Sequence, residues 1–575
     1  MSLKKSLEDY VVTIQSCLQK QDFSNALNAI NDALIDYPSN PKLYINGGNI
    51  YKINGDLNNA EIYFKRALEI HKSKEVLNNL SVIELEKFNY QKSIDYAMSA
   101  IDIDPGYTDA YYNLALSMER IGDYSQAIKY ANKAYNLSKR TEYLILLYRV
   151  LQNVCDWEKI DEISDALDED IGNGTEHPFL NISRIDDESI NFTVAKSWAE
   201  NNIYNSLVIK NANQNKEKGK IKLAYICGEL RNHPTYHLIK DLFKNHNKDD
   251  FEIYIFSYNH DDDIKNEVQK DVHKFISLDN ISDNNAIDLI SGFNIDILID
   301  LSIIITNNRQ KIISSRPAKK VISYLGYPGT SGHSFYDYII TDEIVTPYDQ
   351  QKYYTEKFLY LPRTYQVNSS KKFIKKDNVL KNDHNLPSHS IVLSCFNQSF
   401  KIDEPIFKSW VNILKTIPST YLWILEDNEL AKFNLTKYAN SKGIESGRVI
   451  FAPRIDRNNH LKRLAFVDIA LDTRIYNGHT TTTDALQTGV PVVTIRGNHF
   501  ASRVSAGLLS SVGLEELVVH NIQEYEEKII KLCKDRSYFK RIKEKLSNNE
   551  NMKNFYDIKK FANELESSLK NILKS

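Results

Sequence analysis

The stretch Gly478-His479-Thr480-Thr481-Thr482-Thr483-Asp484 follows an apolar run and opens a helical pattern. The apolar run, residues 467–471, is typical of a buried strand, and residues 483–487 are expected to form the helix that follows it. Threonine hydroxyls and unpaired backbone N–H groups at the start of a helix attract phosphate. A strand, a polar turn and a helix in this order form the nucleotide-phosphate site of an open α/β sheet. The stretch therefore predicts an enzyme that handles a nucleotide-activated substrate.

The composition is typical of a globular protein. The 575 residues, of which 42% are hydrophobic, suit roughly three or four domains. A formal net charge of −3 gives no electrostatic case for binding nucleic acid or an anionic membrane. The five cysteines lack the spacing of a metal site, the N-terminus does not resemble a secretory signal, and no run of about 18 apolar residues is present. We therefore expect a soluble, cytoplasmic protein with no metal site and no membrane span.

Small residues recur at a fixed interval in the first quarter of the chain. They are Ala26 and Ala33, Ala60 and Ala67, Ser93 and Ala100, and Ala127 and Ala134. The steps of 34, 33 and 34 residues match the tetratricopeptide period, in which small residues let two helices pack closely. Gly55 and Gly122 stand at the expected turns between helices. We predict an α-helical tetratricopeptide superhelix over residues 1–139, followed by a helical cap and linker over 140–218.

Asn46, Asn79 and Asn113 occupy the same slot on the first helix of three successive repeats. First helices line the concave face of such an array, so the three amides are expected to form a ladder. An amide both donates and accepts hydrogen bonds, which suits the backbone of an extended peptide of any sequence. The alternative is that the three side chains are merely solvated. The ladder interpretation predicts protein or peptide acceptors bound along the repeat groove.

Beyond Lys220, short β runs alternate with helical patterns, as in parallel α/β sheets. In the first half the predicted strands are residues 221–226, 251–258, 295–301 and 320–325. In the second half they are residues 391–395, 421–425, 448–451, 467–471 and 491–495. We predict two Rossmann-like domains, residues 219–375 and 376–575, with a cleft between them. The second domain is expected to end in an amphipathic helix over 556–573.

A series of motifs runs through both halves. They are residues 233–235 (His-Pro-Thr), 325–332 (Leu-Gly-Tyr-Pro-Gly-Thr-Ser-Gly), 337–342, 395–403 (Cys-Phe-Asn-Gln-Ser-Phe-Lys-Ile-Asp), 448–453, 477–484 and 501–504 (Ala-Ser-Arg-Val). In order and spacing, and with a repeat array before them, they closely resemble the O-GlcNAc transferase family. The resemblance implies a GT-B fold and an inverting transfer of GlcNAc from UDP-GlcNAc to Ser or Thr hydroxyls of proteins, with no cofactor and no required metal.

The resemblance also implies roles for residues around the donor. Lys401 is the cation expected to stabilise the charge that grows on the leaving diphosphate, although a lone lysine after a strand is more often a surface residue. His479 is expected between phosphate and sugar, and His460 against the uracil; the alternatives are a core histidine and a surface residue at a helix start. The phosphates are assigned to Gln398, Thr480 and Thr481, the nucleoside to Arg457, Arg463 and Asp484, and the sugar to Leu325, Gly326 and Pro328.

The acceptor hydroxyl needs a general base or a group that positions it. His233 resembles the active-site histidine of the family, and the sequence leaves both roles open. Asp300, near the end of the predicted strand 295–301, is a second candidate. Its alternative is a carboxylate that caps a helix or a loop.

Several departures from the family pattern leave two other functions open. Residues 302–306 (Ser-Ile-Ile-Ile-Thr) replace a Gly-Tyr-Thr segment, Glu229-Leu230-Arg231 replaces an Asp-Phe-Gly-like turn, and Tyr476 stands where animal enzymes have cysteine. The first alternative is a GDP-fucose-dependent protein O-fucosyltransferase of the same fold. The second is a repeat scaffold whose transferase half has lost activity. The turn 329–332 and the pair Tyr338-Ile339 favour GlcNAc over fucose, and the intact Lys401 and the stretch 479–484 oppose the inactive scaffold.

Overall fold

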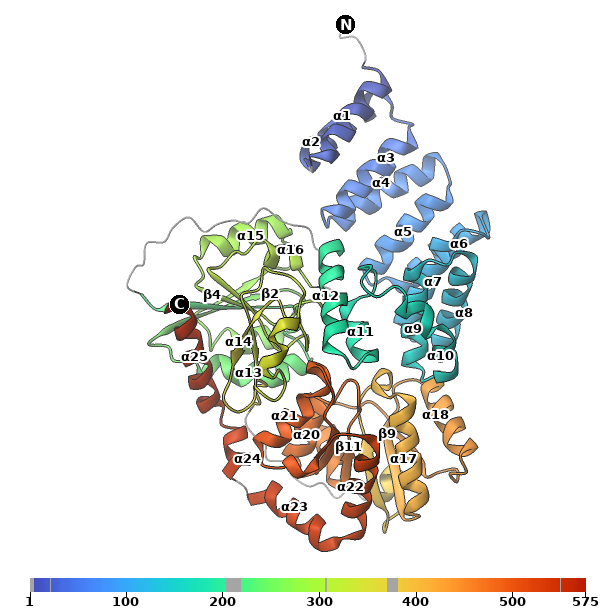
Figure 1. Cartoon of the computed structure of the whole chain (residues 1–575). Helices are drawn as coiled ribbons and strands as arrows, with labels where there is room; N and C mark the ends of the chain where they lie inside the picture. Colours follow the sequence, from blue (N-terminus) through green and yellow to red (C-terminus); the bar gives the residue numbers. More distant parts are fainter. Residues whose placement is uncertain are drawn as a thin grey trace. The chain divides into compact units, whose positions relative to one another are not determined.

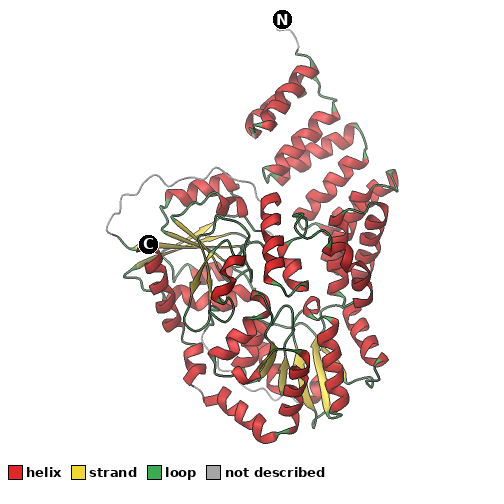
Figure 2. Cartoon of the chain, in the orientation of Figure 1, coloured by secondary structure: helices red, strands yellow, loops and turns green. Residues whose placement is uncertain are grey.

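The computed structural model describes residues 5–20, 22–202, 219–305, 308–369, 381–548 and 550–574. It divides into two compact units, Met1–Leu151 and Gln152–Ser575, whose elements are labelled in Figure 1 and coloured by type in Figure 2. Across these described ranges, no helix has the length and hydrophobicity needed to cross a membrane. The predicted boundary at 375/376 and residue Thr306 lie outside the described residues, and the boundary at 218/219 lies at their edge.

The first unit is an array of helix pairs. Its helices are α1 (Leu7–Gln19), α2 (Phe23–Asp36), α3 (Pro41–Ile53), α4 (Leu57–Ile70), α5 (Lys74–Glu86), α6 (Tyr90–Ile103), α7 (Thr108–Ile121), α8 (Tyr124–Leu137) and most of α9 (Thr141–Asn153). The predicted small residues, Ala26, Ala60, Ser93 and Ala127 among them, are fully buried. Gly122 ends α7 with a left-handed φ of 85°, a conformation that strains other residues. The tetratricopeptide array is confirmed.

The second unit begins with helices α10 (Trp157–Asp168), α11 (Pro178–Arg184) and α12 (Glu188–Asn202). Pro178 opens α11, where its fixed φ suits the first turn, and Nδ1 of His177 accepts the N–H of Phe179 as a cap. Trp157 Nε1 donates to the carbonyl of Ile402 over 3.1 Å. The linker helices are therefore bonded directly to the C-terminal α/β domain.

The first α/β sheet is parallel, with the strand order β3-β2-β1-β4-β5-β6-β7. Its strands are β1 (Ile221–Cys227), β2 (Phe251–Ser257), β3 (Lys274–Ser277), β4 (Ile297–Asp300), β5 (Lys320–Ser323), β6 (Tyr338–Thr341) and β7 (Lys357–Tyr360), and its helices are α13 (Pro234–Asn245), α14 (Asp262–Val268), α15 (Asp283–Gly292) and α16 (Gln310–Ser314). The four predicted strands are confirmed. The sequence analysis missed β3, β6 and β7; β3 and β7 are partly exposed and so lack the continuous apolar run of a buried strand.

The second sheet is also parallel, with the order β10-β9-β8-β11-β12-β13. Its strands are β8 (Ile391–Cys395), β9 (Thr420–Leu425), β10 (Val449–Ala452), β11 (Ile469–Leu471), β12 (Val492–Ile495) and β13 (Val518–Val519). The helices are α17 (Glu404–Thr416), α18 (Glu429–Ser441), α19 (Arg457–Arg463), α20 (Thr480–Gln487), α21 (Val504–Ser511), α22 (Ile522–Lys534), α23 (Arg536–Asn548), α24 (Glu550–Phe555) and α25 (Ile558–Lys574). Five strands match the prediction, and the two-residue β13 was missed.

The last helix, α25, packs against α13 of the first α/β domain. Buried His246 joins them: its Nδ1 lies 2.8 Å from Glu566 Oε1, and its Nε2 lies 2.8 Å from the hydroxyl of Tyr225. The same carboxylate accepts the N–H of Asn247 over 2.8 Å. The chain therefore returns from the second α/β domain to the first, which agrees with a GT-B architecture.

Each sheet changes its winding direction between two neighbouring strands. In the second sheet β8 continues to β9 and β10 on one side, whereas β11 continues to β12 and β13 on the other; β1 and β4 play the same roles in the first sheet. Ligands of open α/β sheets bind outside the carboxyl ends of such strands. Lys401 and Gly478 follow β8 and β11, while His233 follows β1 and Asp300 ends β4. The topology therefore places the candidate residues at the two switch points.

Candidate active site

One buried carboxylate, that of Asp472, stabilises the polar turn between β11 and α20. Asp472 accepts the N–H of Gly478 over 2.6 Å and that of Thr473 over 2.9 Å. Its other oxygen accepts the hydroxyl of Thr494 over 2.7 Å. Burial raises the pKa of Asp472, and the hydrogen bonds oppose that shift. The sequence analysis missed this residue, although its place at the end of an apolar strand was a usable signal.

Helix α20 begins at Thr480, three residues earlier than predicted, because its first intrahelical bond runs from Thr483 N to the carbonyl of His479. The hydroxyl of Thr481 donates to Asn397 Oδ1 over 2.5 Å. That hydroxyl proton is therefore engaged within the protein, which leaves the backbone N–H as the group with which Thr481 can contact a phosphate. A Cβ on Gly478 would lie 2.4 Å from Thr481 Oγ1, so only glycine fits this approach.

Lys401 ends the short 3₁₀ turn Ser399–Lys401 and does not extend into solvent. Its Nζ donates to the carbonyl of Asn477 over 3.0 Å and lies 4.0 Å from the ring centroid of Tyr476. Burial lowers the pKa of Lys401 to about 8, and the negative charge of Asp472 limits the fall. Within the described residues Lys401 forms no ion pair with a carboxylate. A partly desolvated cation with spare donors can bind an anion.

His479 stands directly before α20. Its ring centroid lies 5.1 Å from that of Tyr476, and its Nε2 lies 3.4 Å from the carbonyl of Ala501. Burial and the neighbouring charge of Lys401 hold the pKa of His479 well below its usual value. The imidazole is therefore neutral at physiological pH, and it adds a hydrogen-bonding group to the site without adding charge.

A pocket of about 20 Å³, room for one water molecule, lies at the start of α20. Its lining includes Ser394, Phe396, Asn397, His460, Leu471 and Thr481. His460 Nδ1 accepts from Nε of Arg463 over 3.1 Å, so its Nε2 carries the proton. Burial lowers the pKa of His460 to about 3, with Arg463 adding to the shift. The buried hydroxyl of Ser394 has no hydrogen-bond partner among the described residues, which leaves one polar group of the pocket unpaired.

The two arginines predicted at the nucleoside serve different contacts. Arg463 is 4% exposed, donates to the carbonyl of Pro453 over 2.7 Å and lies 4.4 Å from the ring centroid of Phe396. Arg457 pairs with Asp484 over 2.6 Å, and its buried Nε has no partner in the described part of the chain. The Arg457–Asp484 pair thus supplies an unused donor at this end of the site. Gln398, by contrast, is solvent-exposed in the turn before Lys401.

His233 forms the cap of α13. Its Nδ1 accepts the N–H of Thr235 over 3.3 Å, so in the neutral ring the proton is on Nε2. Burial lowers the pKa of His233, while Glu229, whose carboxylate lies 3.9 Å from Nδ1, opposes the fall. A neutral imidazole in this tautomer donates a hydrogen bond from Nε2 and does not accept a proton there. The geometry therefore favours the positioning role over the role of general base.

Asp300 is 2% exposed at the end of β4. It accepts the hydroxyl of Tyr336 over 2.6 Å and the N–H of Ser302 over 2.8 Å, and burial raises its pKa. Ile303 and Ile304 are buried in a hydrophobic cluster that also contains Tyr476. The apolar departure is therefore part of the core, and the surroundings of Asp300 resemble the loop-carboxylate alternative more than an open catalytic base.

The turn 325–328, which the sequence analysis assigns to the sugar, lies against the end of β4. Leu325 has a left-handed φ of 71°, and a Cβ on Gly326 would lie 2.1 Å from the carbonyl oxygen of Leu301. Only glycine permits this backbone approach. Pro328 is buried two residues later. The turn is thus held close to the switch point of the first sheet.

The three asparagines of the repeats occupy equivalent positions, each five residues after the first residue of its helix. Their surroundings differ: Asn46 is exposed, Asn79 is half-buried and Asn113 is 6% exposed. The amide of Asn113 donates to Oδ1 of Asn78 over 2.8 Å, a partner that the sequence did not suggest. Asn46 and Asn79 are therefore more accessible to a peptide than Asn113.

Comparison with known proteins agrees with this arrangement. The model of glycosyl transferase family 41 matches residues 201–381 and 374–565, and a tetratricopeptide repeat model matches residues 41–73 and 108–141. The chain is 33% identical over 324 residues to the Arabidopsis thaliana protein named probable UDP-N-acetylglucosamine–peptide N-acetylglucosaminyltransferase SEC; the match covers 55% of this chain and 33% of that protein. It is 24% identical over 464 residues to UDP-N-acetylglucosamine–peptide N-acetylglucosaminyltransferase of Caenorhabditis elegans, covering 61% and 40%.

The chain therefore spans about a third to two fifths of the length of these curated relatives. Among solved structures, a mutant of Thermobaculum terrenum O-GlcNAc transferase superimposes with a TM-score of 0.68 at 23% identity, covering 94% of this chain and 98% of that one. This likeness confirms the predicted fold, repeats followed by a GT-B-like pair of sheets. Because the family model matches more than half of the chain, the protein belongs to glycosyl transferase family 41.

Proposed function

We propose that this protein transfers GlcNAc from UDP-GlcNAc to Ser or Thr hydroxyls of proteins, with inversion at the sugar. The observation that carries the proposal is the ammonium of Lys401, held by the Asn477 carbonyl beside the start of α20. The names of the relatives in Arabidopsis thaliana and Caenorhabditis elegans support the choice of donor and of peptide acceptor. The tetratricopeptide array supports a protein acceptor, because such arrays offer extended concave surfaces.

The chemistry follows from where charge develops. As the bond between sugar and diphosphate breaks, negative charge grows on the diphosphate, and preorganised donors lower the barrier. Lys401 supplies a full positive charge, and the first N–H groups of α20, which have no acceptor within the helix, supply partial charge. His479 adds a neutral hydrogen-bonding group. The acceptor oxygen attacks the face of the sugar opposite the diphosphate as the bond to the diphosphate breaks, and the hydroxyl proton is released to solvent; His233 would orient the acceptor oxygen through Nε2–H.

The low pKa of Lys401, about 8, predicts an alkaline limit to activity. Below this pKa the ammonium is charged and stabilises the leaving diphosphate; as the pH rises through it, the proton is lost and transfer slows. We expect kcat/KM for UDP-GlcNAc to fall about tenfold per pH unit above the pKa. The corresponding fall in kcat should occur at higher pH, because the bound diphosphate stabilises the charged form of Lys401. A kcat/KM profile that stays flat through this range would contradict the role of Lys401.

The proposed peptide contacts of the repeats predict a selective effect on acceptors. Replacing Asn46 and Asn79 together by alanine should raise KM for a protein acceptor about tenfold, because each lost hydrogen bond contributes about 0.5–1.5 kcal/mol. Hydrolysis of UDP-GlcNAc in the absence of acceptor should not change. Asn113→Ala, which removes the bond to Asn78, is the control for structural damage to the array. An unchanged acceptor KM in the double variant would mean that these side chains are only solvated.

Donor choice is tested by calorimetry with UDP and GDP on the wild-type protein. The proposal predicts that UDP binds at least about tenfold more tightly than GDP, a difference of about 1.4 kcal/mol. Tighter binding of GDP would instead favour the fucosyltransferase alternative. Absence of binding to either nucleotide would favour the inactive scaffold.

A further inference from the structure

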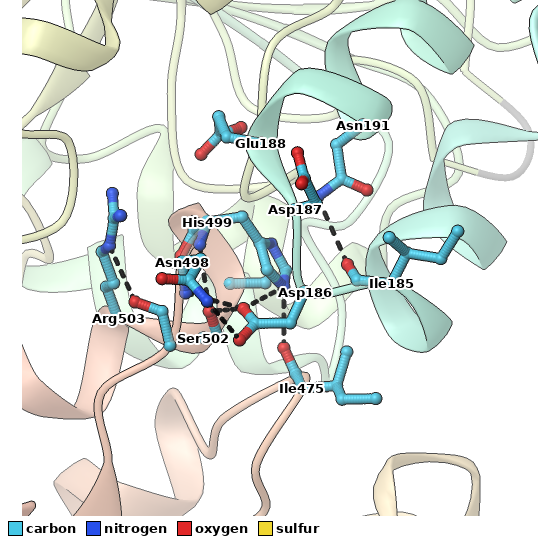
Figure 3. Close-up of polar contacts among 12 residues, drawn as sticks. Ile185, Asp186, Asp187, Glu188, Asn191, Ile475, Asn498, His499, Ser502 and Arg503 are labelled. Carbon is cyan, nitrogen blue, oxygen red and sulfur yellow. Dashed lines mark hydrogen bonds and ion pairs between the residues drawn. The ribbon is translucent and has the colours of Figure 1, made fainter. Parts of the chain in front are cut away.

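Asp186, in the loop between α11 and α12, bonds the C-terminal α/β domain, and Glu188 at the start of α12 adds a second contact by accepting the N–H of Phe500 over 3.0 Å. Asp186 Oδ1 accepts the N–H of Asn498 over 2.7 Å and the hydroxyl of Ser502 over 2.7 Å, and Oδ2 accepts the side-chain amide of Asn498 over 3.1 Å. Figure 3 shows these contacts converging on Asp186. A Cβ on Gly497 would lie 2.6 Å from Asp186 Oδ1, so the two segments are in close contact. We call this contact of Asp186 with residues 497–502 the clasp.

Residues 497–502 in turn support the turn that carries the candidate active site. The carbonyl of Ala501 accepts the N–H of Asn477 over 3.0 Å and lies 3.4 Å from Nε2 of His479. Nε2 of His499 lies 2.9 Å from the carbonyl of Ile475 and 3.7 Å from Asp186 Oδ1. Because a carbonyl only accepts, His499 donates through Nε2. The clasp is thus connected to residues on both sides of Tyr476.

The same turn determines the position of the cation. Lys401 donates to the carbonyl of Asn477 and lies over the ring of Tyr476. A shift of residues 475–479 would therefore move Lys401 and His479 together. Displacements of about 1 Å around reacting groups are known to cost on the order of 100-fold in rate.

We infer that Asp186 is a positioning residue for the donor site, acting through residues 497–502 on the turn 475–479. The inference rests on the proposed function, since it names a residue that orients the same donor-binding groups. Asp186 contacts neither the pocket nor Lys401, so its effect is indirect. Nothing in the local sequence around Asp186 marked it, because its partners lie more than 300 residues away.

The test compares three variants by calorimetry with UDP and by steady-state kinetics. Asp186→Ala should raise the Kd of UDP about tenfold and lower kcat/KM for UDP-GlcNAc by about 10- to 100-fold, while KM for the peptide acceptor stays unchanged. Asp186→Asn should restore most of the loss, because the amide of Asn498 can turn to keep the hydrogen bonds. Asp187→Ala is the matched control: Asp187 is exposed and caps α12 by accepting from Ser189, and among the described residues its interaction with residues 497–502 is electrostatic, with His499, and not a hydrogen bond.

Wild-type UDP affinity and kcat/KM in Asp186→Ala would overturn the inference, as would an equal loss in Asp187→Ala. If Asp186→Ala does not fold, Ser502→Ala removes one contact of Asp186 together with the hydrogen bond that Ser502 Oγ accepts from the N–H of His499, and normal UDP binding in that variant would overturn the inference. Hydrogen exchange at the Asn477 amide gives a readout without any ligand: the clasp predicts faster exchange in Asp186→Ala. If neither UDP nor GDP binds the wild type, the proposed function fails, and the exchange rate alone decides on the clasp.

Discussion

Lys401→Ala should lower the rate of glycosyl transfer by about 10²- to 10³-fold, the usual cost of removing one preorganised donor at a site of growing charge. The side chain contributes a full positive charge, and its pKa is already lowered to about 8 by burial. The loss should appear in kcat as well as in kcat/KM, because the charge on the diphosphate is larger in the transition state than in the bound substrate. Steady-state transfer to a peptide, with the two constants separated, measures it.

Folding should be unaffected, because alanine removes a desolvated cation and one hydrogen bond, not a core side chain. The matched control is Lys408→Ala, an exposed lysine on the neighbouring helix α17, which should transfer at the wild-type rate. A wild-type kcat in Lys401→Ala would contradict the role of Lys401 as the cation that stabilises the leaving diphosphate. An equal loss in both variants would indicate a general effect of lysine removal.

Asp472→Ala should destabilise the protein by about 3–5 kcal/mol, because it leaves buried donors without an acceptor. The donors are the backbone N–H groups of Thr473 and Gly478 and the hydroxyl of Thr494. We therefore expect a clear fall in the melting temperature of the transferase unit and loss of activity. A melting temperature equal to that of the wild type would show that the turn does not depend on this carboxylate.

Asp472→Asn separates the charge of this residue from its hydrogen bonds. The amide oxygen can still accept from the two N–H groups, so stability should largely return. The negative charge that raises the pKa of Lys401 is lost, so the alkaline limb of kcat/KM should move to lower pH. The control is Asp468→Asn. Asp468 lies at the opposite end of the same strand and accepts the N–H of Val392. The alkaline fall of kcat/KM should stay at the wild-type pH in this variant. An unmoved limb in Asp472→Asn would contradict the coupling.

The elements that could be predicted from the sequence either repeat over many residues or are buried on both faces. The repeat array was visible because residues such as Ala60 and Ala127 must be small wherever two helices meet, which imposes a period. Strands such as β8 and β9 were visible because both faces are buried, which gives continuous apolar runs. Strands β3 and β7, four residues long and partly exposed, gave no such run.

The candidate site was only partly predictable, for a different reason. Lys401 and His479 lie in motifs that a family resemblance can locate, and His460 follows one of them, but the protonation of all three depends on burial and on distant partners. The sequence made Asp300 a candidate base, but in the structure its carboxylate accepts a hydrogen bond from Tyr336, 36 residues later. Contacts of this kind have no local signal, because they join segments that only the fold brings together.

The central claim is tested most directly by mass spectrometry of an acceptor lysate incubated with the purified protein and UDP-GlcNAc, with GDP-fucose in parallel. The account predicts a HexNAc addition on Ser or Thr residues with UDP-GlcNAc, and none with Lys401→Ala. Deoxyhexose added from GDP-fucose, or no transfer from either donor, would contradict it.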